Sequence, residues 1–166
     1  MDISNKPILD ACCGGRMFWF NKSNPNVLYV DKREVTEQRI NGGIFKVTPD
    51  ILCDFRFLPF SDKSFKHVVF DPPHMLYAGR GGNMELHYTK LPKDWKPLIK
   101  GGFDECWRVL DDYGTLIFKW SEIDIQLKKI LEVIEREPLY GHRTGASGRT
   151  IWLSFVKIPC SATHIE

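Results

Sequence analysis

An acidic residue followed by two prolines constrains this chain more than any other feature. Residues 66–71 are largely apolar and predict a buried strand, and Asp71-Pro72-Pro73-His74 stands at its end. Proline fixes φ and has no N–H, so neither a helix nor a central strand continues through Pro72-Pro73. The motif therefore predicts a rigid, extended turn with free carbonyl oxygens. Such a turn can accept hydrogen bonds from a bound group, for example an amino group.

Length and charge limit the organisation of the chain. The 166 residues are enough for one well-packed domain, which we expect to span 1–166. Residues 75–102 show weak periodicity, and we expect them to form a substrate lid or insertion. With 23 basic and 21 acidic residues the net charge is +2, so any contact with nucleic acid has to be local.

Composition also indicates where the protein works and what it does not bind. No apolar run reaches the roughly 20 residues that cross a bilayer, and the N-terminus has no hydrophobic signal core, so we expect a cytoplasmic protein without membrane contact. The five cysteines are odd in number and lack paired Cys-x-x-Cys spacing. This argues against a disulfide framework and a zinc site, and we expect no metal.

Short apolar runs alternate with helical periodicity along the chain. The predicted strands are 7–11, 26–31, 51–53, 66–71 and 115–120, the predicted helices are 103–110 and 123–137, and the runs 139–142 and 150–156 flank a glycine-rich turn. This order predicts an α/β, doubly wound, Rossmann-like sheet, mostly parallel, with helices on both faces. The final hairpin requires the last strand to insert antiparallel.

Three acids stand at or just after the ends of predicted strands: Asp10, Asp31 and Asp54. Ligands of parallel sheets bind beyond these carboxyl ends, and Gly14 lets a backbone approach a ligand closely there. A dinucleotide-binding Gly-x-Gly-x-x-Gly starting at Gly14 would need glycine where Arg16 and Trp19 stand. The loop is therefore not built for a pyrophosphate.

The segment Asp10-Ala11-Cys12-Cys13-Gly14-Gly15-Arg16 and the Asp71-Pro72-Pro73-His74 turn resemble the class I S-adenosylmethionine-dependent methyltransferases. The similarity is to the branch of amino-methyltransferases with an acid-Pro-Pro-aromatic turn, in particular small phage and prophage members, and it runs from residue 8 to 157. It implies a seven-stranded sheet with its last strand antiparallel. It also implies S-adenosyl-L-methionine as the cofactor.

The resemblance assigns roles to the loop residues at the strand ends. It implies that Asp10 and the backbone from Cys12 to Arg16, including Gly14, contact the methionyl group of the cofactor. Asp31 is expected to accept the ribose hydroxyls. Asp54 is expected to bind the adenine amino group, with Phe55 nearby.

The turn itself is the expected catalytic centre, comprising Asp71, Pro72, Pro73 and His74. The Asp71 carboxylate and the Pro72 carbonyl would each accept one amino hydrogen, which points the nitrogen lone pair at the methyl group. His74 departs from the usual aromatic residue. We expect it to stack on the base, with proton shuttling or a plain backbone contact as alternatives.

Basic and aromatic residues follow the turn and suit a nucleic-acid substrate. The expected substrate-binding residues are Tyr77, Arg80, Lys93, Lys96 and Trp120, although core packing is an alternative for Trp120. Lys119, next to Trp120 at the end of the fifth predicted strand, is also expected to lie near enough to line the pocket. We therefore predict methylation of an exocyclic base amine, adenine N6 in DNA before RNA. Cytosine N4, a protein glutamine, a small molecule and a non-catalytic cofactor-binding subunit remain alternatives, and a homodimer is a candidate assembly.

Overall fold

The computed structural model describes residues 5–38, 42–77 and 89–159. Its centre is a seven-stranded sheet with the order β5-β2-β1-β6-β7-β9-β8. The strands are β1 (Ile8–Asp10), β2 (Val27–Asp31), β5 (Ile51–Leu52), β6 (Phe65–Phe70), β7 (Leu110–Ser121), β8 (Tyr140–Thr144) and β9 (Thr150–Val156). Within this sheet β9 runs opposite to the other six strands. The predicted mostly parallel sheet with an antiparallel last strand is confirmed.

Both predicted helices exist, with different limits. Helix α2 (Lys96–Val109) begins seven residues before the predicted start, because Pro97 suits a first helical turn and the apolar face already includes Ile99. Helix α3 (Leu127–Ile134) is shorter than predicted. It begins where Glu122 accepts the Leu127 N–H at 2.9 Å, and it ends at Glu135, whose φ is +55°.

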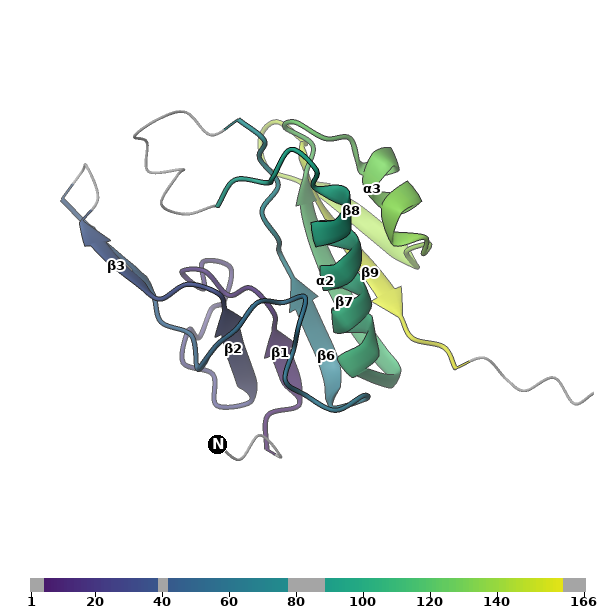
Figure 1. Cartoon of the computed structure of the whole chain (residues 1–166), viewed down its shortest axis with the longest axis horizontal. Coiled ribbons are helices and arrows are strands. Elements are labelled where there is room, and N and C mark those ends of the chain that lie inside the picture. Colours follow the sequence, from purple (N-terminus) through teal and green to yellow (C-terminus); the bar gives the residue numbers. More distant parts are fainter. Residues whose placement is uncertain (1–4, 39–41, 78–88, 160–166) are drawn as a thin grey trace, which may run out of the picture.

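The sequence did not indicate a separate hairpin formed by β3 (Val35–Gln38) and β4 (Ile44–Val47). Of these two strands, β4 alternates between exposed and buried residues, whereas most of β3 is exposed. With only four residues in each strand and three of the four exposed in β3, the apolar signal is too short to identify the pair. Figure 1 shows β3 extending away from the main sheet.

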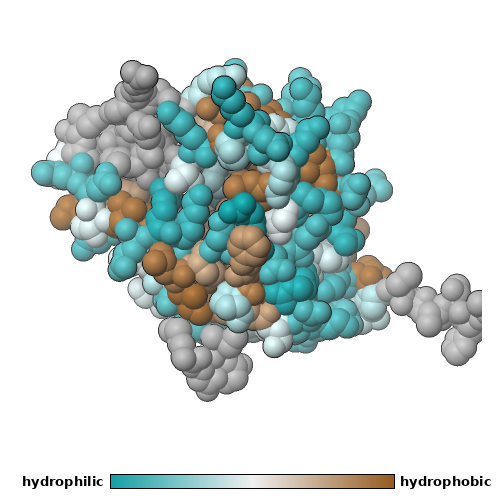
Figure 2. Space-filling view, viewed as in Figure 1, coloured by the Kyte–Doolittle hydropathy of each residue, from teal (hydrophilic) through white to brown (hydrophobic). Residues whose placement is uncertain are grey.

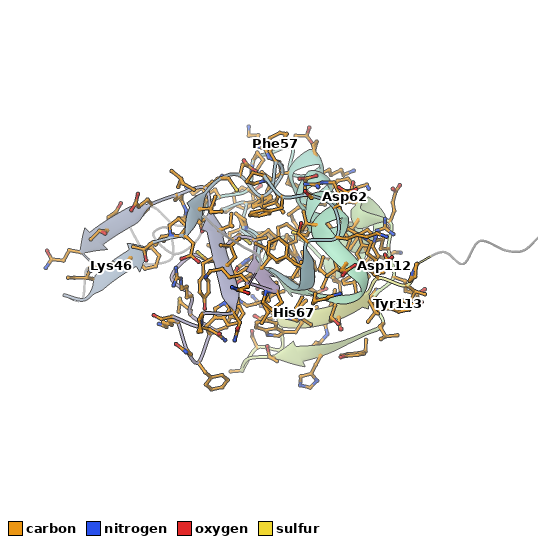
Figure 3. The ribbon with its side chains drawn as sticks, turned by 90° about the horizontal axis from the view of Figure 1, so that it is seen from below. Lys46, Phe57, Asp62, His67, Asp112 and Tyr113 are labelled. Carbon is orange, nitrogen blue, oxygen red and sulfur yellow. The ribbon has the colours of Figure 1, made fainter. Side chains whose placement is uncertain are left out.

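The two described helices lie on the same face of the sheet. They pack against each other, and Figure 1 shows both in front of the strands. The main apolar core fills the space beneath them, with Phe70, Phe103 and Phe118 fully buried. Figure 3 shows these layers from below, with Phe57 on the helix side and Lys46 on the projecting hairpin.

The opposite face differs from the prediction of helices on both faces. Among the described residues, the loop between β1 and β2 packs there instead of a helix. Cys13 and Trp19 from this loop pack with Tyr29 of β2, and Phe18 contacts Trp152 of β9 edge-on at 5.4 Å. Aromatic side chains of the loop therefore cover part of the face that a helix was expected to cover.

The surface on the helix side is mostly hydrophilic, and Figure 2 shows hydrophobic areas there as small patches. No helix within the described ranges is long and apolar enough to span a membrane.

The segment between β6 and α2 is held by a backbone contact, because the Leu91 N–H donates to the Met75 carbonyl at 2.8 Å. Of the expected lid 75–102, residues 96–102 belong to α2.

Candidate active site

A cavity opens where the strand order reverses. The chain passes from β1 outward to β2 and β5, and then returns to place β6 on the other side of β1. In open α/β sheets this switch point is where ligands bind. The cavity is lined by Cys12, Cys13, Gly14, Gly15, Met17, Phe18, Asp31, Lys32, Arg33, Phe55, Asp71, Pro73, Thr89 and Lys119. The loop after β1, the end of β2 and the turn after β6 therefore share one site.

The loop after β1 is tied directly to the acid at the end of β2. Gly14 has a φ of +47°, a left-handed conformation that glycine adopts without strain, and its N–H donates to Asp31 Oδ2 at 2.9 Å. The other carboxylate oxygen, Oδ1, accepts the Arg33 N–H at 3.0 Å. A carboxylate has about four lone-pair sites, so the Asp31 side chain retains acceptor capacity toward the cavity.

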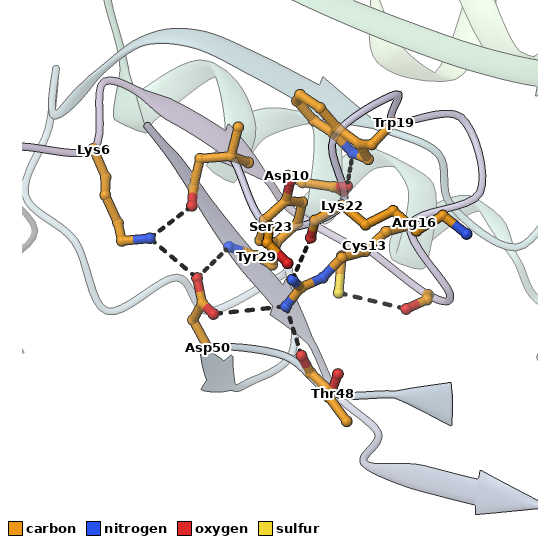
Figure 4. Close-up of polar contacts among 12 residues, drawn as sticks. Lys6, Asp10, Cys13, Arg16, Trp19, Lys22, Ser23, Tyr29, Thr48 and Asp50 are labelled. Atoms are coloured by element: carbon orange, nitrogen blue, oxygen red, sulfur yellow. Dashed lines mark hydrogen bonds and ion pairs between the residues drawn. The ribbon is translucent and has the colours of Figure 1, made fainter. Parts of the chain in front are cut away.

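Arg16 fixes the far end of the same loop, as Figure 4 shows. Its guanidinium donates to the Lys22 carbonyl at 2.7 Å and to the Thr48 carbonyl at 2.6 Å. It also lies 3.6 Å from the centre of the Tyr29 ring. These contacts hold Arg16 at a φ of +53°, which is unfavourable for a residue with a Cβ.

Asp10 is fully buried and faces this network rather than the cavity lining. The indole N–H of Trp19 donates to its Oδ2 at 2.7 Å, and the Cys12 N–H reaches Oδ1 at 3.4 Å. Burial raises the pKa of Asp10 to about 7, although the Trp19 hydrogen bond opposes the shift. The carboxyl group therefore holds the loop in place within this network.

Asp71 presents a buried carboxylate to the cavity. Its Oδ2 accepts a hydrogen bond from Lys119 Nζ at 2.7 Å, whereas its buried Oδ1 has no hydrogen-bond partner among the described residues. Burial raises the pKa of Asp71, and the charge of Lys119 opposes that rise. A buried acceptor without a partner costs free energy, and such groups gather at functional sites.

The rest of the turn divides between the cavity and the core. Pro73 lines the cavity, whereas Pro72 and His74 are buried. The His74 ring packs edge-on against Trp120 at 6.2 Å and has a pKa lowered mainly by burial, while a hydrogen bond with the Pro72 backbone raises it. Trp120 is fully buried, and its indole N–H donates to the Ile125 carbonyl at 2.9 Å. Trp120 therefore belongs to the core, in agreement with the alternative to its predicted role in substrate binding.

The residues after β5 are split in a similar way. Phe55 lines the cavity, whereas Asp54 is paired with the Arg56 guanidinium at 2.8 Å, which lowers the pKa of Asp54.

Cys12, in the loop after β1, lines the cavity as well, and burial raises the pKa of its thiol well above the usual range. A protonated thiol is a poor nucleophile, so the raised pKa argues against a nucleophilic role for Cys12.

The predicted substrate residues are not gathered around the cavity. Tyr77 is 83% exposed, and Lys93 and Lys96 are exposed at the start of α2. Arg80 lies outside the described residues. In the described part of the chain no group of three His, Cys, Asp or Glu side chains could hold a metal ion.

Five lining residues were not among the predicted site residues: Met17, Phe18, Lys32, Arg33 and Thr89. Lys119, expected near the pocket as the neighbour of Trp120, does line the cavity, and it alternates along β7 with the buried Phe118 and Trp120. A second, adjoining cavity shares Gly14, Gly15 and Met17 and is lined further by Arg16, Lys22, Ser23, Ile44, Phe45, Lys46 and Thr48. Exposed lysines therefore stand beside the first cavity.

Comparison with known proteins identifies the fold. No protein-family model and no curated protein matches the chain. Among solved structures, the PH0226 protein from Pyrococcus horikoshii OT3 has a TM-score of 0.59 at 14% identity, covering 90% of this chain and 81% of that one. A TehB-like SAM-dependent methyltransferase from Corynebacterium glutamicum has a TM-score of 0.53 at 18% identity, covering 92% and 80%. The chain therefore has a Rossmann-like fold of the kind found in methyltransferases.

Proposed function

We propose that this protein transfers a methyl group from S-adenosyl-L-methionine to an exocyclic amine of a nucleic-acid base, with adenine N6 in DNA as the first candidate. The observation that carries the proposal is the buried Asp71 Oδ1, an acceptor without a partner among the described residues, on a residue that lines the cavity at the switch point of the sheet. An amino group with two hydrogens is the ligand that such an acceptor suits.

The lining fits the proposed cofactor in its chemistry. Gly14 and Gly15 bring backbone close to the cavity, Asp31 offers carboxylate acceptors for ribose hydroxyls, and Phe55 offers an aromatic surface for a purine ring. S-adenosylmethionine, when bound, supplies an electrophilic methyl group on a sulfonium.

Asp71 has two tasks in the proposed reaction. A base amine is a weak nucleophile, because its lone pair is delocalised into the ring. Asp71 Oδ1 would accept one amino hydrogen, and the Pro72 carbonyl, which bonds His74 and keeps a second lone pair, would accept the other. These two bonds would turn the lone pair out of the ring and stabilise the positive charge that develops on nitrogen. When the new C–N bond forms and the S–C bond breaks, nitrogen must lose one proton. Asp71 Oδ1 is positioned to receive it.

Phe18 suits the stacking role that the sequence suggested for His74. Its ring lines the cavity and lies 5.6 Å from Lys119 Nζ, the group that binds Asp71. His74, by contrast, is 5% exposed and packed on Trp120. We assign base stacking to Phe18, because a flipped or single-stranded base needs an accessible aromatic face.

Basic side chains support a nucleic-acid substrate. Lys32 and Arg33 line the first cavity, and Lys22 and Lys46 line the adjoining one. Phosphate contacts from such residues would orient the strand while the base enters the first cavity. Double substitution Lys22→Glu with Lys46→Glu should lower DNA affinity and its salt dependence more than the matched pair Lys93→Glu with Lys96→Glu, which lies outside both cavities.

The function is tested by incubating the protein with radiolabelled S-adenosylmethionine and separate pools of DNA, RNA, protein and small amines, followed by digestion and identification of the labelled unit. We expect label in N6-methyladenine from DNA. Label on cytosine N4 or in RNA would keep the chemistry and change the substrate. Label on carbon or oxygen, or on no pool while the cofactor binds, would contradict the proposal.

A further inference from the structure

We propose that Lys119 is a positioning residue for Asp71, occupying one carboxylate oxygen so that the other is held toward the substrate amine. This inference rests on the proposed function and concerns how the carboxylate is prepared for it. The ammonium group lies 2.7 Å from Asp71 Oδ2, and Oδ1 has no partner among the described residues. In a residue that lines the cavity, one carboxylate oxygen is thus engaged by Lys119 and the other is left without a partner.

The position of Lys119 is fixed from several sides. Lys119 belongs to β7 and stands between the buried Phe118 and Trp120, so its backbone is held within the sheet. Its Nζ lies 5.6 Å from the Phe18 ring centre and 5.5 Å from that of Trp152, within the range of cation–π attraction. A lysine is normally flexible, and this arrangement restricts it to one place beside Asp71.

The charge of Lys119 also suits this task. The ionisable groups that act on Asp71 or feel its charge are Lys119 from β7, His74 from the same turn, and Asp10 and Cys12 from β1 and its loop. Burial alone favours a protonated Asp71, and Lys119 is the strongest of these neighbours in opposing it. An ionised carboxylate accepts hydrogen bonds and donates none, which is what an amino group requires.

The pair predicts an unusual response to an amide at position 71. Asparagine has one acceptor oxygen, and Lys119 would take it, because an ammonium group only donates. The amide NH2 would then face the substrate NH2, donor against donor. In Asp71→Asn with Lys119→Met the amide is free to turn its oxygen to the cavity. The double variant should therefore be more active than Asp71→Asn alone.

The experiment measures kcat, KM and the pH profile of kcat in the wild type, Lys119→Met, Asp71→Asn and the double variant. We expect Lys119→Met to lower kcat about 10²-fold with little change in KM, and to move the acidic limb of the profile to higher pH. Lys119→Gln is the second variant if methionine prevents folding. Lys66→Met is the matched control, because Lys66 makes an exposed ion pair with Asp111 at the other end of the sheet.

A second readout needs no turnover. NMR titration of the Asp71 carboxyl should give a higher pKa in Lys119→Met than in the wild type, and no change in Lys66→Met. Equal Asp71 pKa values in the wild type and Lys119→Met would overturn the inference, as would a double variant no more active than Asp71→Asn. A wild-type protein that methylates no amine would instead defeat the proposed function, and the NMR result would still decide whether Lys119 controls Asp71.

Discussion

The part of the sheet before β6 and the part that follows it are stabilised in different ways. Around β1 and β2, loops are fixed by polar contacts: Arg16 bonds two carbonyls, and the buried Asp10 accepts the Trp19 indole N–H. Around β6, β7 and β9, aromatic side chains pack beneath α2 and α3, and the Phe118 ring contacts Phe70 of β6 and Phe103 of α2. The cavity lies at the boundary between these two parts of the sheet, which we call the seam, and its lining includes Gly14 and Asp31 from the first part and Asp71 and Lys119 from the second.

This difference gives the two sides of the cavity different properties. On the β1 and β2 side, a loop held by the Gly14–Asp31 hydrogen bond lines the cavity with backbone and with carboxylate acceptors. On the β6 and β7 side, Asp71 and Lys119 stand on or next to central strands of an aromatic core. We infer that the first side serves cofactor affinity and the second side serves the chemical step.

The sharpest test of that division compares Asp71→Ala with Asp31→Ala. Loss of Asp71 should lower kcat by about 10²–10³-fold, because it removes the acceptor of the amino hydrogens. Cofactor affinity should stay nearly unchanged. Asp31→Ala should mainly weaken cofactor binding. Calorimetry for affinity and steady-state kinetics for kcat separate the two, and the division would be wrong if both variants changed both quantities alike.

Asp10 should make the β1 side sensitive to pH. Its folded-state pKa of about 7 lies above the ordinary 3.8, so between these values the folded chain keeps a proton that the unfolded chain has lost. The free energy of unfolding should therefore fall as pH rises from about 4 to 7, by on the order of 4 kcal/mol in total.

Urea unfolding at several pH values measures how the free energy of unfolding changes with pH. In Asp10→Asn the contribution of residue 10 is absent, so the curve should be flatter over the same window. Asp71, whose pKa is also raised, remains in both proteins. Parallel curves for the wild type and the variant would contradict the buried, protonatable state of Asp10.

Two arginines offer a matched pair across the seam. Arg16 bonds carbonyls of the β1 side, and Arg108 of α2 bonds the Leu58 and Phe60 carbonyls at 3.0 and 2.8 Å. Replacement of either by alanine should lower the free energy of unfolding by about 1 kcal/mol, because each pair of carbonyls loses a charged hydrogen-bond donor. Cofactor affinity should fall clearly in Arg16→Ala alone. A comparable fall in Arg108→Ala would remove the distinction between the sides.

The smallest effect concerns neighbouring glycines in α2. A Cβ at Gly102 would stand 2.5 Å from a ring atom of Phe55 and 2.7 Å from one of Phe70, whereas at Gly101 the nearest atom is 3.7 Å away, on Arg56. Gly101→Ala should stabilise by up to about 1 kcal/mol through helix propensity. Gly102→Ala should destabilise by about 1 kcal/mol net and weaken cofactor binding, because Phe55 would be pushed toward the cavity. Thermal melts with and without cofactor check both.

Much of the fold was predictable, because the strands of the sheet and the final hairpin leave strong apolar signals. The run before Asp71 and the residues 150–156 gave β6 and β9 nearly to the residue. The β3 and β4 hairpin was not predictable, since most residues of β3 are exposed. The absence of a described helix between β1 and β2 was missed because the prediction assumed that both faces of the sheet carry helices.

The site was predictable where a residue follows a strand, and less so where partners come from afar. The sequence indicated Gly14, Asp31 and Asp71, all of which line the cavity. It did not indicate that Lys119, 48 residues away, binds Asp71. Nor did it show that local partners turn Asp10 and Asp54 into structural contacts, with Trp19 and Arg56 respectively.

A crystal structure with S-adenosylhomocysteine, the product form of the cofactor, tests the central claim most directly. The account predicts the ribose hydroxyls at Asp31, the purine beside Phe55, and the sulfur facing the Asp71 carboxylate across a gap wide enough for one amino nitrogen, about 3–3.5 Å from each reacting partner. A molecule bound away from this seam, or one whose sulfur is walled off from Asp71, would contradict it.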